Sequence, residues 1–148
     1  MTDFEIRAAV AEDLPAIVAM LADDPLGAAR ETPHDLAPYR RAFDALDTDP
    51  RQHLLVAARA GRVIGVAQLT VIPGLSRTAM TRGQIEGVRA HADARGAGVG
   101  AALIEHAVDL ARGAGCGLAQ LTTDISRADA HRFYERLGFV KSHYGYKL

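Results

Sequence analysis

The stretch that decides the fold is Gln-Ile-Glu-Gly-Val-Arg-Ala-His-Ala-Asp-Ala-Arg-Gly-Ala-Gly-Val-Gly-Ala-Ala-Leu-Ile-Glu, which runs from Gln84 to Glu105. Its first part, residues 85–90, has the pattern of a strand, and residues 95–100 form a turn with glycines at three alternate positions. From Val99 the spacing of apolar and small residues predicts a helix with one buried stripe. This order of elements suits an anion site, because the first N–H groups of a helix have no partner within it.

Two kinds of nucleotide-binding loop can be compared with this turn. A loop of the ATPase kind ends in Gly-Lys-Ser/Thr, and here Gly98 is followed by Val-Gly-Ala, which excludes that kind. A dinucleotide loop, Gly-x-Gly-x-x-Gly/Ala, matches through Gly96, Gly98 and Ala101, and the acidic Asp124 follows at about the expected 20 residues. Such a loop normally follows the first strand of a parallel sheet, whereas here most of the predicted strands come before it.

A third kind of loop, which binds the pyrophosphate of an acyl-CoA, has the pattern Arg/Gln-x-x-Gly-x-Gly/Ala. Arg95, Gly98 and Gly100 match this pattern. The plain alternative is a connection that merely tolerates glycine. It is disfavoured because each interior glycine costs about 0.5–1 kcal/mol relative to alanine, so three at alternate positions require a reason.

Length and composition narrow the class of protein. The 148 residues predict one domain, residues 1–148, with a single core. A net charge of −1 gives no electrostatic basis for binding nucleic acid or an anionic membrane. The single cysteine, Cys116, excludes an internal disulfide framework and a multi-cysteine metal site, and we expect it to be buried and inert. Without a signal-peptide pattern or a long apolar run, the expected location is the cytoplasm.

Hydrophobic periodicity predicts the remaining elements. In chain order they are a strand at 4–10, helices at about 11–22 and 35–46, a hairpin of strands at 53–59 and 63–72, a strand at 83–91, a helix at 99–112, a strand at 117–123, a helix at 128–137, and closing strands at 139–140 and 144–148. The order β-α-α-β-β-β-α-β-α-β-β predicts a single-domain α/β fold with a mixed, mostly antiparallel sheet and helices on both faces. Gly87, in mid-strand, indicates a β-bulge or the close approach of a ligand.

A second block, Ala130-His-Arg-Phe-Tyr-Glu-Arg-Leu-Gly-Phe139, follows the loop Arg95–Gly100. Together the two blocks closely resemble the GCN5-related N-acetyltransferase (GNAT) superfamily, and the element order extends the resemblance over nearly the whole chain. The resemblance implies acetyl-CoA as the donor, no metal, and direct transfer of the acetyl group to a primary amine of a small molecule or a peptide or protein. A silent acyl-CoA-binding module and a nucleotide- or NAD-binding domain remain as alternatives.

The resemblance also implies which residues hold the donor. The pantetheine pairs like an added strand with the end of the strand at 83–91, and the pyrophosphate lies on the glycine loop. The residues implied are Val88, Arg89 and Ala90 on the strand, Arg95, Gly96, Ala97, Gly98, Val99, Gly100 and Ala101 in the loop, and Ser126. A free backbone N–H at the bulge near Gly87 and Val88 would stabilise the charge that develops on the thioester carbonyl.

Two side chains are implied for proton transfer. Tyr134 matches the tyrosine that protonates the leaving thiolate, and Glu86 matches a glutamate that deprotonates the incoming amine, often through water. His91 and His131 are rival bases, although a surface or capping role is expected for each.

The resemblance is less complete at two points. Many relatives carry Asn where this chain has Ser126 and Arg127, so Ser126 or the Arg127 backbone replaces that cofactor contact, or the contact is absent. The acceptor is not identified by the sequence, although Glu31, Asp35 and Glu86 are candidates to attract an amine. Dimers are common in the superfamily, so a homodimer is among the options.

Overall fold

The structure, a computed structural model, describes residues 2–148. Its elements are β1 (Glu5–Ala8), η1 (Ala11–Asp13), α1 (Leu14–Ala22), α2 (Pro25–Arg30), α3 (Ala37–Asp47), β2 (Gln52–Arg59), β3 (Arg62–Ile72), α4 (Ser76–Ala79), β4 (Arg82–Ala90), η2 (Ala92–Ala94), α5 (Val99–Gly113), β5 (Leu118–Leu121) and α6 (Ala128–Arg136). The strands form one sheet in the order β1-β2-β3-β4-β5, and only the β4–β5 pair is parallel. The α/β fold with a mixed, mostly antiparallel sheet is therefore confirmed.

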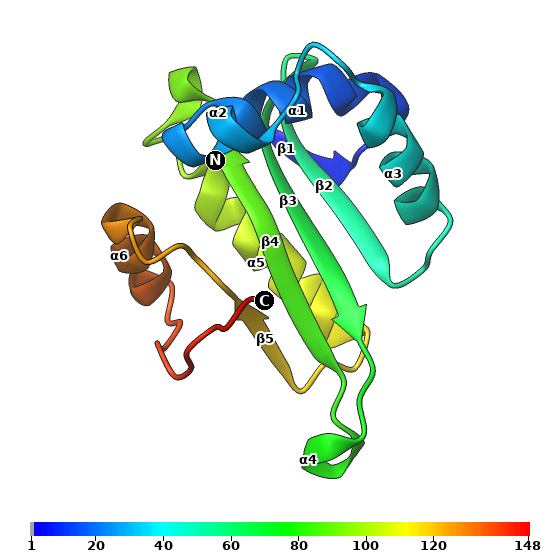
Figure 1. The fold of residues 1–148 in the computed structure, drawn as a ribbon, viewed down its shortest axis with the longest axis vertical. Coiled ribbons are helices and arrows are strands. Elements are labelled where there is room, and N and C mark those ends of the chain that lie inside the picture. Colours follow the sequence, from blue (N-terminus) through cyan, green and yellow to red (C-terminus); the bar gives the residue numbers. More distant parts are fainter. Residues whose placement is uncertain (1) are drawn as a thin grey trace.

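Helices cover both faces of this sheet, with α5 behind it and α1 and α3 in front in the view of Figure 1. The alternation of side chains along a strand assigns each residue to one face. On β2, Leu55 and Ala57 belong to the core beneath α5, whereas Val56 belongs to the core beneath α1 and α3. Each core strand is therefore apolar on both faces, as expected for a sheet between two helical layers.

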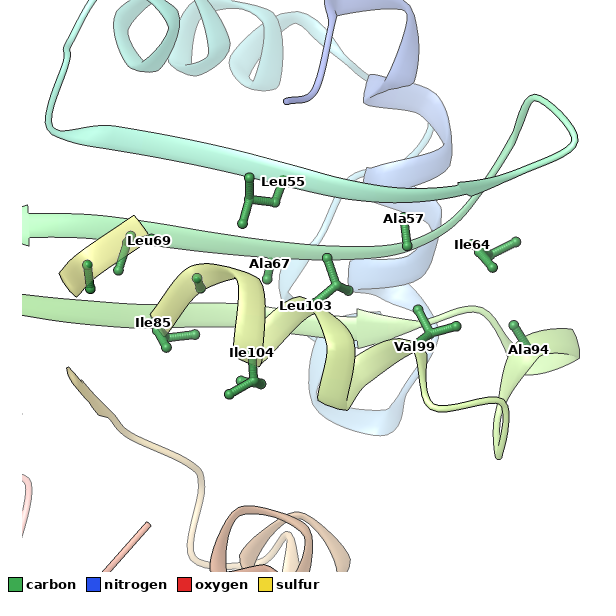
Figure 2. Close-up of a cluster of buried hydrophobic side chains, with 12 residues drawn as sticks. Leu55, Ala57, Ile64, Ala67, Leu69, Ile85, Ala94, Val99, Leu103 and Ile104 are labelled. Atoms are coloured by element: carbon green, nitrogen blue, oxygen red, sulfur yellow. The ribbon is translucent and has the colours of Figure 1, made fainter. Parts of the chain in front are cut away.

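The larger core fixes the start of α5 on the sheet, as Figure 2 shows. Val99 and Leu103 on α5 are buried against β3. A Cβ atom at Gly65 of β3 would lie only 2.5 Å from Val99 Cγ1 and 2.9 Å from Leu103 Cδ1, so glycine is required for this close approach. The glycine loop before α5 is thus held by a tightly packed first turn.

β4 carries the irregularity that Gly87 predicts. Its pairing with β3 shifts register between residues 66 and 68, and Gly87 has a φ of +65°. A β-bulge is therefore confirmed at this position. The parallel pairing with β5 covers only Arg82–Ile85. Within residues 2–148, the end of β4 beyond Ile85 has no registered partner on that side, and the chain leads from the end of β5 to α6, on the left in Figure 1.

The prediction of closing strands is wrong. Residues 139–140 and 144–148 form no strand, and Val140, Tyr144 and Tyr146 are almost fully exposed. A strand pattern becomes a strand only with a hydrogen-bonding partner, and no sheet edge of the described chain pairs with this segment.

The segment between the predicted helices at 11–22 and 35–46 contains the short helix α2. Asp24 is its N-cap and accepts a hydrogen bond of 2.6 Å from the Gly27 N–H, while Pro25 occupies the first helical position. Both are favourable features of a helix start, and they outweigh the turn signals of this segment.

Candidate functional site

The glycine loop ends in a set of free amides. Gly96 and Gly98 have φ angles of +83° and +80°, which glycine adopts without strain, and Gly98 is the N-cap of α5. The first helical hydrogen bond runs from the Ala102 N–H to the Gly98 carbonyl at 3.0 Å. The N–H groups of residues 99–101 precede it and have no acceptor within the helix. A Cβ atom added at Gly96 or Gly98 would meet nothing within 4 Å, so the loop faces open space.

Two of the implied loop amides are used inside the turn. The Arg95 N–H donates to the Ala92 carbonyl at 3.4 Å, and the Ala97 N–H donates to the Ala94 carbonyl at 3.2 Å. The amides of the loop glycines and of the first helical turn are therefore better candidates for binding a phosphate. The Arg95 guanidinium lies 3.7 Å from Asp23 and is largely exposed, so its positive charge stands at the mouth of the loop.

The end of β4 presents different side chains to the two faces of the sheet. Ile85, Val88 and Ala90 pack into the core on the α5 side. Strand alternation and the bulge direct Glu86 and Arg89 to the opposite face, where Arg89 lies against Asp24. The backbone of residues 88–90 thus forms the end of β4 that leads, through η2, into the glycine loop.

Tyr134, on α6, is packed by aromatic neighbours. Its ring makes edge contacts with Phe133 and Phe139 at centroid distances of 5.2 and 6.0 Å. Burial raises the pKa of the Tyr134 phenol, against the opposing effect of the Arg89 and Arg127 charges. The phenol therefore stays protonated at neutral pH and can donate a proton or a hydrogen bond.

The two residues implied for proton transfer approach β4 from different sides. Tyr134 packs against the core on the α5 side, whereas Glu86 is exposed on the α1 side. The side chains of Tyr134 and Glu86 therefore lie on opposite faces of the sheet.

The rival histidines both have structural roles. His91 caps η2 by accepting a hydrogen bond of 3.1 Å from the Asp93 N–H. The Nε2 atom of His131 lies 2.9 Å from the Asp124 carbonyl oxygen. These contacts agree with the capping roles expected from the sequence.

Ser126 lies in a tight turn before α6. Its hydroxyl and its N–H donate to Asp124 Oδ1 at 2.7 and 2.9 Å. The Ser126 hydroxyl, the Ser126 N–H, Arg30 and Arg127 together hold the pKa of the Asp124 carboxyl below its usual range. A cavity of about 380 Å³ is lined by residues 126–130, so the backbone at the start of α6 faces open space.

An ion-pair network that the sequence did not reveal joins three elements. Asp24 at the start of α2 lies 3.2 Å from Arg89 Nε on β4 and 3.2 Å from Arg127 Nη2 before α6. Burial opposes ionisation of Asp24, but the Gly27 N–H and the two arginines hold its pKa below the usual value. The three charged residues are far apart in sequence, so no local pattern predicts their contact.

Three further features of residues 2–148 concern a thiol, metal ligands and helix length. Burial raises the pKa of the half-buried Cys116 thiol, as expected of an inert cysteine. Within residues 2–148 no group of three or more histidine, cysteine, aspartate or glutamate side chains is arranged to hold a metal ion. None of the described helices combines the length and the apolar character needed to cross a membrane.

Comparison with known proteins finds N-acetyltransferases that are similar to this chain in sequence. Residues 14–139 match the acetyltransferase (GNAT) family. The chain is 34% identical over 140 residues to an aminoalkylphosphonate N-acetyltransferase of Salmonella typhimurium, covering 95% of this chain and 87% of that protein. It is 38% identical over 79 residues to a glucosamine 6-phosphate N-acetyltransferase of Trypanosoma brucei brucei, covering 53% and 52%. A crystal structure described as a transcriptional regulator from Bacillus halodurans superimposes with a TM-score of 0.94, at 44% identity and 98% coverage of both chains.

Proposed function

Because the chain belongs to the acetyltransferase (GNAT) family, we propose that it uses acetyl-CoA to acetylate the primary amine of a small molecule. The observation that carries this proposal is the glycine loop at the start of α5, which presents acceptor-free amides beside the open edge of β4. The two N-acetyltransferases named above are named for small amines, aminoalkylphosphonate and glucosamine 6-phosphate, which supports a small acceptor over a peptide or protein.

The residues of this chain fit acetyl-CoA. The amides of the glycines and of the first turn of α5 would hold its diphosphate, with Arg95 adding positive charge. The open edge of β4 at Val88, Arg89 and Ala90 would pair with the pantetheine amides, as an added strand pairs with a sheet. Val99 would contribute through its backbone N–H, and Ser126 lines the cavity at the start of α6, where the cofactor amide would find a partner.

The two proposed proton transfers use side chains on opposite faces of the sheet at β4. Glu86, exposed on the α1 side, would take a proton from the ammonium group, directly or through water, to free the nitrogen lone pair. The amine nitrogen then bonds to the thioester carbon, the carbon–sulfur bond breaks, and Tyr134 gives its proton to the departing thiolate. A backbone N–H at the bulge would stabilise the carbonyl oxygen as its negative charge develops.

The test is an amine screen in which free thiol is measured. The proposal predicts release of one CoA thiol per acetylated amine, and a loss of turnover in Tyr134→Phe with little change in acetyl-CoA binding. A protein that binds acetyl-CoA but never releases thiol with any amine would be a silent binding module. Thermal shifts with acetyl-CoA, NAD and ATP separate the nucleotide-binding alternative, because a specific ligand stabilises the fold once its concentration exceeds Kd.

The proposal extends to the organisation of the protein. We place one acetyltransferase domain over residues 1–148, without a metal, in the cytoplasm, where acetyl-CoA is available. A stable folded fragment shorter than this range that retains acetyl transfer would contradict the single domain, and recovery of the protein in a secreted fraction would contradict the location.

A homodimer is also part of the proposal. Within the C-terminal segment, residues 144–148 alternate in the manner of a strand, with apolar residues at every second position, and two of these, Tyr144 and Tyr146, are about 90% exposed. β5 is an edge strand, and an unpaired edge accepts a strand from a second copy. The proposal predicts a dimer by light scattering and a monomer after removal of residues 141–148. A full-length monomer at all concentrations would refute it.

A further inference from the structure

Three arginines lie together beside the open end of β4. They are Arg89 on β4, Arg127 before α6 and Arg30 at the end of α2, and we call them the arginine cluster. Two aspartates accompany them. Asp24 lies 3.2 Å from both Arg89 and Arg127, and Asp124 lies 4.0 Å from Arg30. Three positive charges against two negative ones leave the group with an excess of one positive charge.

The excess charge is close to the proposed reaction centre. The charges of Arg89 and Arg127 both act on the phenol of Tyr134, where they oppose the rise of its pKa by burial. The side chains of Arg89 and Arg127 are about one-quarter exposed, so they are shielded from bulk water but still open to a ligand. Charges in such a place interact more strongly than charges on the surface.

The arginines have donors left over. Arg127 uses one nitrogen, Nη2, for both oxygens of Asp24 at 3.2 Å. Arg89 Nη1 donates to the Val88 carbonyl at 2.9 Å, Nε is buried within ion-pair distance of Asp24, and no hydrogen bond joins Nη2 to a described residue. A guanidinium carries five N–H donors in a rigid fork that matches the oxygens of a carboxylate, phosphate or phosphonate.

A purely structural role explains only part of this arrangement. One arginine would be enough to tie Asp24 of α2 to the rest of the fold. Arg127 is a second arginine on Asp24, and Arg30 pairs with Asp124 instead, so the cluster holds more positive charge than Asp24 alone requires. The guanidinium groups also carry further N–H donors, and an anion is the ligand that both features favour. Glu86 lies on the same face of β4 as Arg89, three positions earlier, which corresponds to about 10 Å along an extended strand.

We propose that the arginine cluster binds an acidic group of the acceptor, so that the substrates are short amines bearing a phosphonate, phosphate or carboxylate. This inference rests on the proposed function and adds the acceptor's class to it. The acidic group lies against Arg127 and Arg89, with Arg30 at the entrance, and the amino group then faces Glu86 and the thioester. The short distance between these residues favours a spacer of a few carbon atoms.

The first experiment uses binding alone, so that it does not depend on turnover. Ethylphosphonate, which has no amine, is titrated into the acetyl-CoA complex by calorimetry. The inference predicts binding to the wild-type protein, at least tenfold weaker binding to Arg127→Gln, and unchanged binding to Arg112→Gln. Arg112 is a suitable control because it is exposed at the end of α5 and, among the described residues, pairs with Asp109 alone. Equal binding to all three proteins, or none to the wild type, would overturn the inference.

The second experiment compares acceptors that differ in charge. The inference predicts that kcat/KM falls by at least tenfold from 2-aminoethylphosphonate to propylamine, and further to 1,3-diaminopropane. Arg30→Gln, which alters an exposed side chain and so spares the fold, should raise KM for the phosphonate several-fold and leave propylamine unchanged. Arg127→Lys should restore part of what Arg127→Gln loses. Acetylation of all three amines without preference would overturn the inference but uphold acetyl transfer, whereas no acetylation of any amine would overturn the proposed function itself.

Discussion

Gly98→Ala separates the binding role of the glycine loop from its role in folding. Gly98 has a φ of +80°, in the left-handed region where an L-residue costs about 1–2 kcal/mol. A Cβ atom there would meet nothing within 4 Å, so the conformational cost is the whole cost to the free protein. We therefore expect a loss of about 1–2 kcal/mol of stability, which lowers Tm by about 2–8 °C. The same Cβ occupies the space where the diphosphate would approach the amides.

The matched control is Gly115→Ala. Gly115 has a φ of +82° and equally open surroundings, but it lies after α5, at the opposite end from the loop. Both variants should therefore lose similar stability, whereas only Gly98→Ala should lose affinity for acetyl-CoA. Loss of one charge-assisted hydrogen bond, about 1.5–3 kcal/mol, corresponds to a roughly 10–100-fold increase in Kd by calorimetry. If Gly98→Ala binds acetyl-CoA as tightly as Gly115→Ala, the loop does not hold the diphosphate.

Three further predictions concern catalysis and stability. Tyr134→Phe should lower kcat by about 100-fold, because general acid catalysis contributes roughly 10²–10⁴-fold, while circular dichroism and Tm stay close to wild type. Asp13→Asn should lower the unfolding free energy by about 1.5–3 kcal/mol, because the buried Asp13 carboxylate accepts charge-assisted bonds of 2.7 and 3.1 Å from Arg7. The hydrogen bonds from Arg7 and from the Val10 N–H hold the pKa of Asp13 below its usual value, against the effect of burial. The difference in unfolding free energy between the wild type and Asp13→Asn should therefore be complete above about pH 4 and should disappear at lower pH. Leu103→Ala should cost about 2–5 kcal/mol in chemical denaturation, since Leu103 on α5 is fully buried against the sheet; a cost below 1 kcal/mol would contradict the packing described for that helix.

The fold could be predicted where local physics and tertiary packing agree. The strand, glycine turn and helix around Gly98 were predictable, because positive φ angles require glycine and the helix stripe has a clear period. The bulge at Gly87 was predictable for the same reason. The closing strands were not, because the alternation in residues 144–148 is a strand pattern that says nothing about which sheet edge the segment pairs with.

The site could be predicted only in part. The amides of the glycine loop follow from a motif, and so do the residue types of Tyr134 and Glu86, whose roles stay predictions. The contact of Asp24 with Arg89 and Arg127 could not be predicted, since it depends on how three distant elements meet. One local signal was available: Asp24 and Pro25 begin a helix, and recognising that helix would have placed an acidic N-cap near the site.

The most direct test of the account is a crystal structure of the protein with CoA. We expect diphosphate oxygens within about 3 Å of the amides of Gly98, Gly100 and Ala101, since this is the range of N–H···O hydrogen bonds. The pantetheine should run along the open edge of β4, and the sulfur should lie within reach of the Tyr134 hydroxyl. A complex in which CoA binds elsewhere, while the glycine loop holds no phosphate, would contradict the central claim.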